Sequence, residues 1–337
     1  MAETKRQATV ALVGGDTLAG REVRDVITTA GLAARLKLIG AEEDAATLTA
    51  LDGEPVVVSA LDEGNLTGAD VVILAGSHAS SRKAFQLLEK RLPRPAVIDL
   101  TGRLQDKAEA RLRAPMVEPN GFSFDRDAVQ IIAHPASIAM ALLLRRIPAR
   151  RSVVQVLVPA SEHGKRGVDE LQQQVVSLFS FKPITKEVFD AQVAFNLLSR
   201  FGADATVKLE AIAERIDNDL QALMAYSART AKPSFRLVQA PAFHGYGFSI
   251  WLELEGRAFL REVEEALRSP GIEVRGGDEE APDNVGVAGQ SGLIVGGVEN
   301  DRNCDEAVWL WAVADNLRLA ADNAVAVARQ LLEARAS

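Results

Sequence analysis

The sequence has few of the residues from which disulfides and metal sites are built. Its 337 residues include one cysteine, Cys304, and four histidines, which are His78, His134, His163 and His244. A single cysteine excludes a disulfide framework within the chain and a thiolate metal cluster. The histidines are scattered and show no metal-ligand spacing. The sequence therefore predicts no metal site.

An excess of positive charge and a long apolar run are also missing. Lysine and arginine number 38 against 46 acidic residues, which gives a formal net charge of −8. A nucleic acid or an anionic membrane would call for a basic face. No run approaches the roughly 18 apolar residues of a membrane span, and the first six residues are too polar to begin a secretory signal peptide. We expect no nucleic-acid or membrane partner, and a cytoplasmic location.

The N-terminal region has the pattern of a nucleotide-binding βαβ unit. An apolar run, Thr9–Val13, leads into Gly14-Gly15-Asp16-Thr17-Leu18-Ala19-Gly20 and then into the amphipathic segment Arg21–Ala30. In such units glycines let the backbone approach a pyrophosphate that lies on the helix N-terminus. Here Thr17 stands where a middle glycine would fall, so that a side chain occupies the place where backbone and phosphate should meet. The pattern predicts the fold and leaves open whether the loop binds a cofactor.

Acidic residues follow the second expected strand, Arg35–Ile39. Glu42 and Glu43 lie in the segment after it. Acids at this place suit a ribose 2′-hydroxyl and oppose a 2′-phosphate. If either nucleotide binds, NAD is therefore favoured over NADP, with weak binding expected for both. The alternative is a solvated acidic loop.

Further strands alternate with helices up to about residue 135. One expected strand, Ala69–Ala75, leaves through Gly76 and Ser77, which we place at the cofactor edge; another covers Ala96–Leu100. This alternation predicts an α/β fold with a Rossmann-type, doubly wound parallel sheet.

The stretch Val129–Arg146 reads as strand, turn and helix. Its turn, His134-Pro135-Ala136-Ser137, places Ser137 near the helix N-terminus, where the helix dipole favours an oxyanion. Ser137 is thus either a nucleophile or a helix cap. The cap is favoured, because no histidine or carboxylate stands at an obviously activating spacing.

After Arg151 the pattern becomes mixed. Strands are expected at 152–159, 235–239, 248–254, 292–298 and 308–313, and helices at 168–179, 203–224 and 258–267. They predict a second, α+β domain around an antiparallel-rich sheet. We expect residues 1–136 plus 314–337 to form the first domain, through a final helix that returns to it, and residues 137–313 to form the second. Trp251, Trp309 and Trp311, on or beside the second sheet, fill either a homodimer interface or the internal core.

Seven motifs, in order, resemble those of aspartate-semialdehyde dehydrogenases. They are Val13–Gly20, Val117–Asn120, Ile132–Pro135, Gly164–Leu171, Ala194–Asn196, Val238–Phe243 and Trp311–Arg318. The resemblance implies a homodimer with a dimerisation domain, and an NADPH-dependent reduction of β-aspartyl phosphate through a cysteine thioester, in amino-acid biosynthesis. It also assigns Asn316 to the cofactor.

The reactive residues do not carry over. Ser137 occupies the cysteine position, Tyr246 the position of the histidine base, and Gln239 that of the substrate arginine. The orienting glutamine falls near Val158, and the phosphate-binding arginine near Leu104, one position from Arg103.

Three hypotheses follow. The first is a catalytically silent member that keeps the fold and the dimer and binds a nucleotide or a partner. The second is an enzyme with altered chemistry that uses Ser137 or the substitute base His244, whose side chain shares the facing of Tyr246 only if the strand continues through Gly245. The third is an ordinary dehydrogenase with Cys304 as nucleophile. Acidic neighbours of Cys304 oppose the third, because they raise a thiol pKa.

Overall fold

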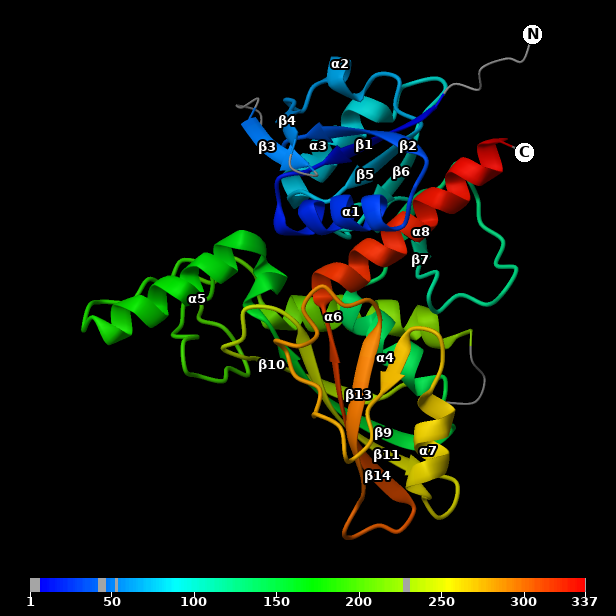
Figure 1. Cartoon of the computed structure of the whole chain (residues 1–337). Coiled ribbons are helices and arrows are strands. Elements are labelled where there is room, and N and C mark those ends of the chain that lie inside the picture. The colour runs from blue at the N-terminus through cyan, green and yellow to red at the C-terminus, as the bar shows by residue number, and fades with distance from the viewer. Residues whose placement is uncertain (1–6, 42–46, 52–53, 227–230, 337) are drawn as a thin grey trace. The chain divides into compact units, whose positions relative to one another are not determined.

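The structure is a computed structural model that describes residues 7–41, 47–51, 54–226 and 231–336 (Figure 1). The chain divides into two compact units. Unit 1 consists of the residues up to Ala133 and from Ala320 onward, and unit 2 is His134–Leu319.

Unit 1 is built on a six-stranded sheet in the order β2-β1-β5-β6-β8-β7, with every pair parallel. Its strands are β1 (Ala8–Val13), β2 (Ala34–Ile39), β5 (Val71–Leu74), β6 (Ala96–Asp99), β7 (Ala110–Arg113) and β8 (Val129–Ile132). The helices are α1 (Leu18–Thr29), α2 (Glu63–Leu66) and α3 (His78–Leu88), and β3 (Thr47–Leu51) pairs with β4 (Glu54–Val58) in a separate hairpin. Strands β5, β6 and β8 are buried along their whole length, as expected of parallel strands covered on both faces. The predicted doubly wound α/β fold is confirmed.

The C-terminal helix α8 (Asn316–Ala336) contributes to unit 1 from Ala320 onward. Asn323 accepts a hydrogen bond from the backbone N–H of Met116 at 3.2 Å, and Gln330 accepts one from Arg113 at 2.5 Å. The Arg113 guanidinium is 1% exposed and donates at 2.8 and 3.0 Å to Glu118. A paired and hydrogen-bonded charge is the form in which arginine tolerates burial.

Unit 2 contains a mixed six-stranded sheet in the order β10-β9-β11-β14-β13-β12. Its strands are β9 (Ala149–Val158), β10 (Ser234–Gln239), β11 (Tyr246–Leu254), β12 (Ile272–Val274), β13 (Leu293–Asn300) and β14 (Ala307–Ala314). The two outer pairs are parallel and the inner pairs antiparallel. The helices are α4 (Pro135–Leu144), α5 (Gly164–Phe179), α6 (Leu209–Met224) and α7 (Leu260–Leu267), with a short 3₁₀ turn at Ala160–His163.

The two faces of the sheet in unit 2 differ in burial. Val154, Phe248 and Leu310 lie on one face and are each at most 2% exposed. Trp251 and Trp309 are cross-strand partners on the other face, where Val153 is 48% and Trp309 38% exposed. This face carries the three tryptophans. Trp309 is exposed, whereas Trp311 packs against a buried cluster of Val287, Ile294 and Val313.

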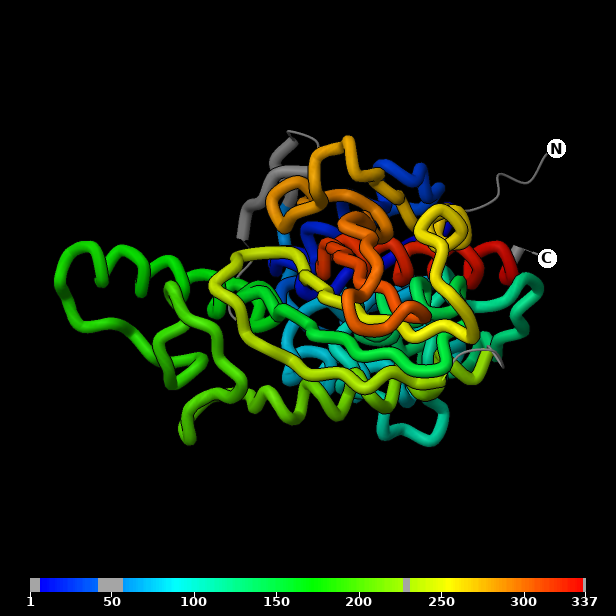
Figure 2. Tube along the Cα trace, turned by 90° about the horizontal axis from the view of Figure 1, so that it is seen from below, coloured from blue at the N-terminus to red at the C-terminus, as the bar shows by residue number. Residues whose placement is uncertain are grey.

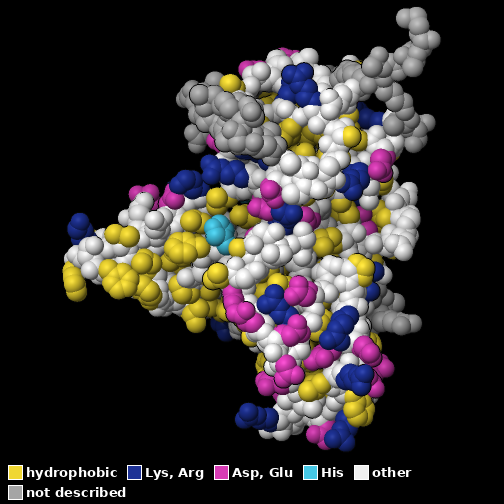
Figure 3. Space-filling view, viewed as in Figure 1, with side chains coloured by type: hydrophobic (Ala, Val, Ile, Leu, Met, Phe, Trp, Pro, Cys, Tyr) yellow, Lys and Arg dark blue, Asp and Glu magenta, His cyan; other side chains and the backbone are white. Residues whose placement is uncertain are grey.

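The far end of α5 and the segment after it extend away from the sheet of unit 2 in two perpendicular views (Figures 1 and 2). Hydrophobic side chains gather over this extension (Figure 3). Phe179 is 73% and Phe195 64% exposed, and their rings meet edge to face at 5.7 Å. Among the described residues, no helix is long and apolar enough to cross a membrane.

Candidate functional site

The glycines of the first loop are explained by close backbone approach. A Cβ added at Gly14 would lie 2.4 Å from the Cα of Gly76, and one added at Gly20 would lie 1.9 Å from the carbonyl oxygen of Gly14. Gly14 also has a φ of +82°, which disfavours side chains. The β1–α1 loop and the turn after β5 therefore lie in close contact at Gly14 and Gly76.

Thr17 caps helix α1. Its hydroxyl accepts the backbone N–H of Gly20 at 3.0 Å and lies 2.8 and 2.7 Å from the carbonyl oxygens of Gly14 and Ala75. The Thr17 hydroxyl thus points back into the loop. From this position it does not block a phosphate, contrary to what the sequence had led us to expect. The first-turn N–H groups of Leu18 and Ala19 have no helical acceptor and are the donors that this terminus offers.

The other predicted cofactor residues have the following surroundings. Gly15 packs against Leu38, and Asp16 is exposed. The Ser77 hydroxyl caps α3 by accepting the N–H of Ser80 at 3.1 Å. Asn316 belongs to unit 2, where its side-chain oxygen accepts hydrogen bonds from the hydroxyl of Ser161 and the N–H of Gly245. Glu42 and Glu43 lie outside the described residues.

The predicted cap at Ser137 is wrong. Helix α4 is capped by His134, whose Nδ1 accepts the backbone N–H of Ala136 at 3.2 Å. Ser137 is 0% exposed, and its hydroxyl donates to the backbone carbonyl of Ile216, on α6, at 3.0 Å. The hydroxyl at the cysteine position is therefore committed to joining two helices.

Tyr246 and His134 share one carboxylate. The Tyr246 hydroxyl donates to Oε2 of Glu162, in the 3₁₀ turn, and His134 Nε2 lies 2.9 Å from Oε1. Since Nδ1 of His134 accepts a hydrogen bond, Nε2 carries the ring proton and donates a hydrogen bond to the carboxylate. The three side chains, named here the His134–Glu162–Tyr246 network, link α4, the turn after β9 and the start of β11.

The network holds Glu162 ionised. Burial acts to raise the pKa of Glu162, but the proximity of His134 and the hydrogen bonds from His134 and Tyr246 outweigh it and lower the pKa to about 2. Burial, followed by the charge of Glu162, raises the pKa of Tyr246 well above its ordinary value. At neutral pH the phenol therefore stays protonated and donates to a carboxylate, so it cannot act as a base.

Gln239, at the arginine position, is also turned inward. It is 0% exposed, and its amide donates to the backbone carbonyls of Val158 at 2.9 Å and Ala240 at 3.0 Å. Val158, at the position of the orienting glutamine, is buried. Neither residue offers a charge or a free donor to a substrate.

Two further groups surround the network. Asp219 on α6 accepts the backbone N–H of His134 at 2.8 Å and lies 3.8 Å from Arg215. Burial raises the pKa of Asp219, against Arg215 and the His134 N–H, which lower it. His163 packs edge-on against Phe189 and Phe201, and burial lowers its pKa although Glu162 acts to raise it.

The alternative nucleophile and base lie elsewhere. His244 precedes β11 and is separated from it by Gly245, whose φ is +79°, so strand alternation does not give it the facing of Tyr246. Cys304 lies in the turn between β13 and β14, with its Sγ 3.6 Å from a Glu306 carboxylate oxygen. Leu104 is buried in the core of unit 1, and Arg103 pairs with Asp106.

Sequence reasoning missed Glu162 as a functional residue. Its partners lie 28 residues before it and 84 residues after it, so no local pattern connects them. The sequence feature that could have pointed to Glu162 is the pair Glu162-His163, two titratable residues directly before the Gly164–Leu171 motif. Among the described residues, no group of three or more His, Cys, Asp or Glu side chains is placed to hold a metal ion.

Comparison with known proteins gives the family. Residues 141–319 match the model of the semialdehyde dehydrogenase dimerisation domain. The chain is 29% identical over 309 residues to a USG-1 protein homolog of Pseudomonas aeruginosa, covering 89% of this chain and 90% of that protein.

Solved structures agree. A probable aspartate-semialdehyde dehydrogenase from Pseudomonas aeruginosa superposes with a TM-score of 0.83 at 26% identity, over 97% of this chain and 99% of that one. The structure of a Candida albicans aspartate-semialdehyde dehydrogenase with NADP has a TM-score of 0.65 at 13% identity, over 97% and 99% of the two chains, and shows a shared fold. The chain belongs to the semialdehyde dehydrogenase family, and residues 141–319 are its dimerisation domain.

Proposed function

We propose that this protein is a catalytically silent relative of aspartate-semialdehyde dehydrogenase that keeps the fold, the dimer and a weak nucleotide site. One observation carries the proposal. The residues at the cysteine, histidine and arginine positions, Ser137, Tyr246 and Gln239, are each 0% exposed and each donate their polar hydrogens to partners inside unit 2. A reacting group has to be free to contact its substrate.

A steady-state assay tests this proposal. The protein is mixed with aspartate semialdehyde, NADP and phosphate, and NADPH formation is followed by absorbance at 340 nm. A relative that bears the name of the enzyme, the Rickettsia bellii aspartate-semialdehyde dehydrogenase, is the positive control. We expect no formation above the protein-free rate. Turnover that disappears in Ser137→Ala would instead establish altered chemistry at that hydroxyl.

The dimer is proposed to form through the exposed tryptophan face of the sheet in unit 2. This face carries Val153, Trp251 and Trp309, with the indole N–H groups of both tryptophans bound to Asp301 at 3.1 and 2.7 Å. An apolar sheet face that its own unit leaves uncovered is typical of an interface. In a twofold dimer the same face of each subunit forms the interface, so one substitution changes both sides of it.

For the wild type, we expect a light-scattering mass of twice the chain mass at micromolar concentration. Val153→Glu places a charge on each side of the proposed interface and should shift the mass to that of a monomer. Val57→Glu, at a valine of similar exposure in unit 1, is the control and should stay dimeric. A monomeric wild type contradicts the proposed interface.

The nucleotide site is proposed to prefer NAD. Glu42 and Glu43 would repel a 2′-phosphate, at about 1 kcal/mol for each charge in wet surroundings. By calorimetry we expect NAD to bind more tightly than NADP, and Glu42→Gln with Glu43→Gln to strengthen NADP binding about tenfold or more. Micromolar NADP affinity in the wild type contradicts this preference.

A further inference from the structure

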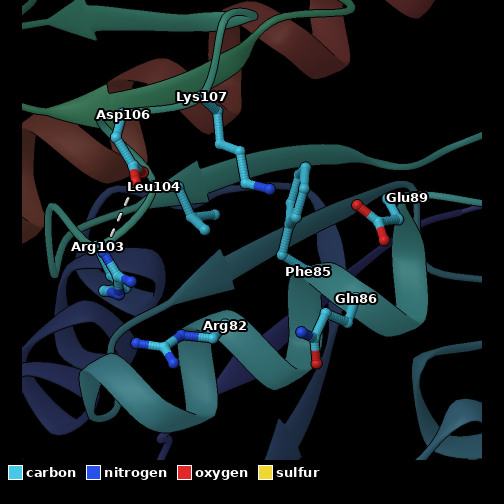
Figure 4. Close-up of a pocket in the computed structure, with 8 residues that line it drawn as sticks. All are labelled: Arg82, Phe85, Gln86, Glu89, Arg103, Leu104, Asp106 and Lys107. Carbon is cyan, nitrogen blue, oxygen red and sulfur yellow. Dashed lines mark ion pairs between the residues drawn. The ribbon is translucent and has the colours of Figure 1, made fainter.

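A cavity of about 190 Å³ lies in unit 1 between α3 and the loop that joins β6 to β7 (Figure 4). Residues of α3 and of the turn that ends it form one wall, and residues of the β6–β7 loop form the other. The lining residues are Arg82, Phe85, Gln86, Glu89, Arg103, Leu104, Asp106 and Lys107. None of them belongs to unit 2, so the cavity is independent of the network described above.

Cations outnumber anions in this cavity. Arg82, Arg103 and Lys107 face Glu89 and Asp106, on a chain whose net charge is −8. Arg103 lies 3.9 Å from Asp106 with side chains 35% and 69% exposed, which makes a weak ion pair that a ligand can replace. A local excess of positive charge on an acidic protein attracts anions to that place.

The cations are arranged around an apolar floor. Phe85 and Leu104 are each 2% exposed, and Lys107 Nζ lies 4.9 Å from the centroid of the Phe85 ring. Figure 4 shows Arg82 and Arg103 at one end of the cavity and Glu89 at the other. Two guanidinium forks at one end match the geometry of a carboxylate or a phosphate.

We propose that this cavity binds a small organic anion. Its carboxylate or phosphate lies between Arg82 and Arg103, and its body fills the cavity beside Lys107, above the buried Phe85 and Leu104. Arg103 therefore serves this site, whereas the neighbouring Leu104, near which the resemblance places the phosphate-binding arginine, is buried beneath it.

Calorimetry on the full chain tests the proposal with four probes: phenyl phosphate, benzoate, inorganic phosphate and phenol. We expect saturable binding of phenyl phosphate or benzoate, at least tenfold weaker binding of inorganic phosphate, and none of phenol. Tighter binding of phenyl phosphate would indicate a phosphate ligand, and tighter binding of benzoate a carboxylate ligand. Binding should weaken as ionic strength rises.

Arg82→Ala and Arg103→Gln should each weaken binding of the tighter probe at least tenfold, because each removes one of the two guanidinium groups at that end of the cavity. Lys90→Ala removes an exposed charge close to α3 but outside the cavity and should change the affinity less than twofold. The absence of saturable binding to every probe, or equal weakening by Lys90→Ala, overturns the proposal. Amide chemical shifts that change away from α3 and the loop overturn it as well.

Discussion

Replacing Ser137 by cysteine alone is expected to leave the protein without measurable semialdehyde dehydrogenase activity. A thiolate at the start of α4 would benefit from the helix dipole. Tyr246, however, remains a protonated phenol bound to Glu162, and Gln239 still offers no charge to the substrate carboxylate. Each absent group typically costs a factor of about 10² or more, so the restoration of one of three leaves the rate below detection.

The matched comparison is the triple variant Ser137→Cys, Gln239→Arg and Tyr246→His, which restores all three family residues. Both variants are assayed for aspartate-semialdehyde-dependent NADPH formation, with far-UV circular dichroism as the control for folding. Activity in Ser137→Cys alone would mean that this chain supplies the base and the carboxylate clamp from residues assigned no such role here. His244 would then be the first residue to replace.

Removing the charge of Glu162 is expected to have the largest effect on stability. Glu162→Ala would leave the Tyr246 hydroxyl and the proton on His134 Nε2 without an acceptor, and both side chains are at most 2% exposed. Each buried donor that is left without an acceptor costs about 1–3 kcal/mol. We expect the urea midpoint at pH 7 to fall accordingly, whereas Glu255→Gln, at an exposed glutamate, should leave it unchanged.

The contribution of Glu162 to the free energy of unfolding should depend on pH. The folded-state pKa of Glu162 is lowered to about 2 from 4.5, so its ionised form stabilises the folded state above pH 4.5, and that contribution is lost as the pH falls toward 2. The difference corresponds to about 3 kcal/mol. The free-energy gap between wild type and Glu162→Gln should therefore be constant above about pH 5 and shrink between pH 5 and 2. A gap that does not change over this range would show that Glu162 is not held ionised by its partners.

The strands and helices that the sequence predicts best are those with one dominant local signal. β8 and α4 are mostly apolar, and the structure buries all of β8 and nine of the ten residues of α4. The strand β7 was not predicted, because Ala110–Arg113 alternates two arginines with two apolar residues and lies at a sheet edge. The strand β12 is only three residues long.

The sequence predicts which residues occupy the family's reactive positions, but not the contacts that they make. The resemblance identifies Ser137, Tyr246 and Gln239 as substituted, but their hydrogen bonds depend on long-range contacts. Ser137 was predicted to be a cap because serine at a helix start usually is one. The histidine three residues earlier takes that role, since its ring folds back onto the N–H of Ala136. This leaves the serine hydroxyl to bind Ile216.

The central claim is that the hydroxyl of Ser137 is not available for chemistry, and intact-mass spectrometry tests it most directly. The protein is incubated for hours with aspartate semialdehyde and NADP, and in a parallel sample with NAD, in the absence of phosphate. An attack by Ser137 on the aldehyde carbon, with hydride transfer to NADP and loss of the hydroxyl proton, would accumulate an ester on the serine even if turnover were very slow. We predict an unmodified mass. An aspartyl ester mapped to Ser137, formed together with an equivalent of NADPH, would contradict the account.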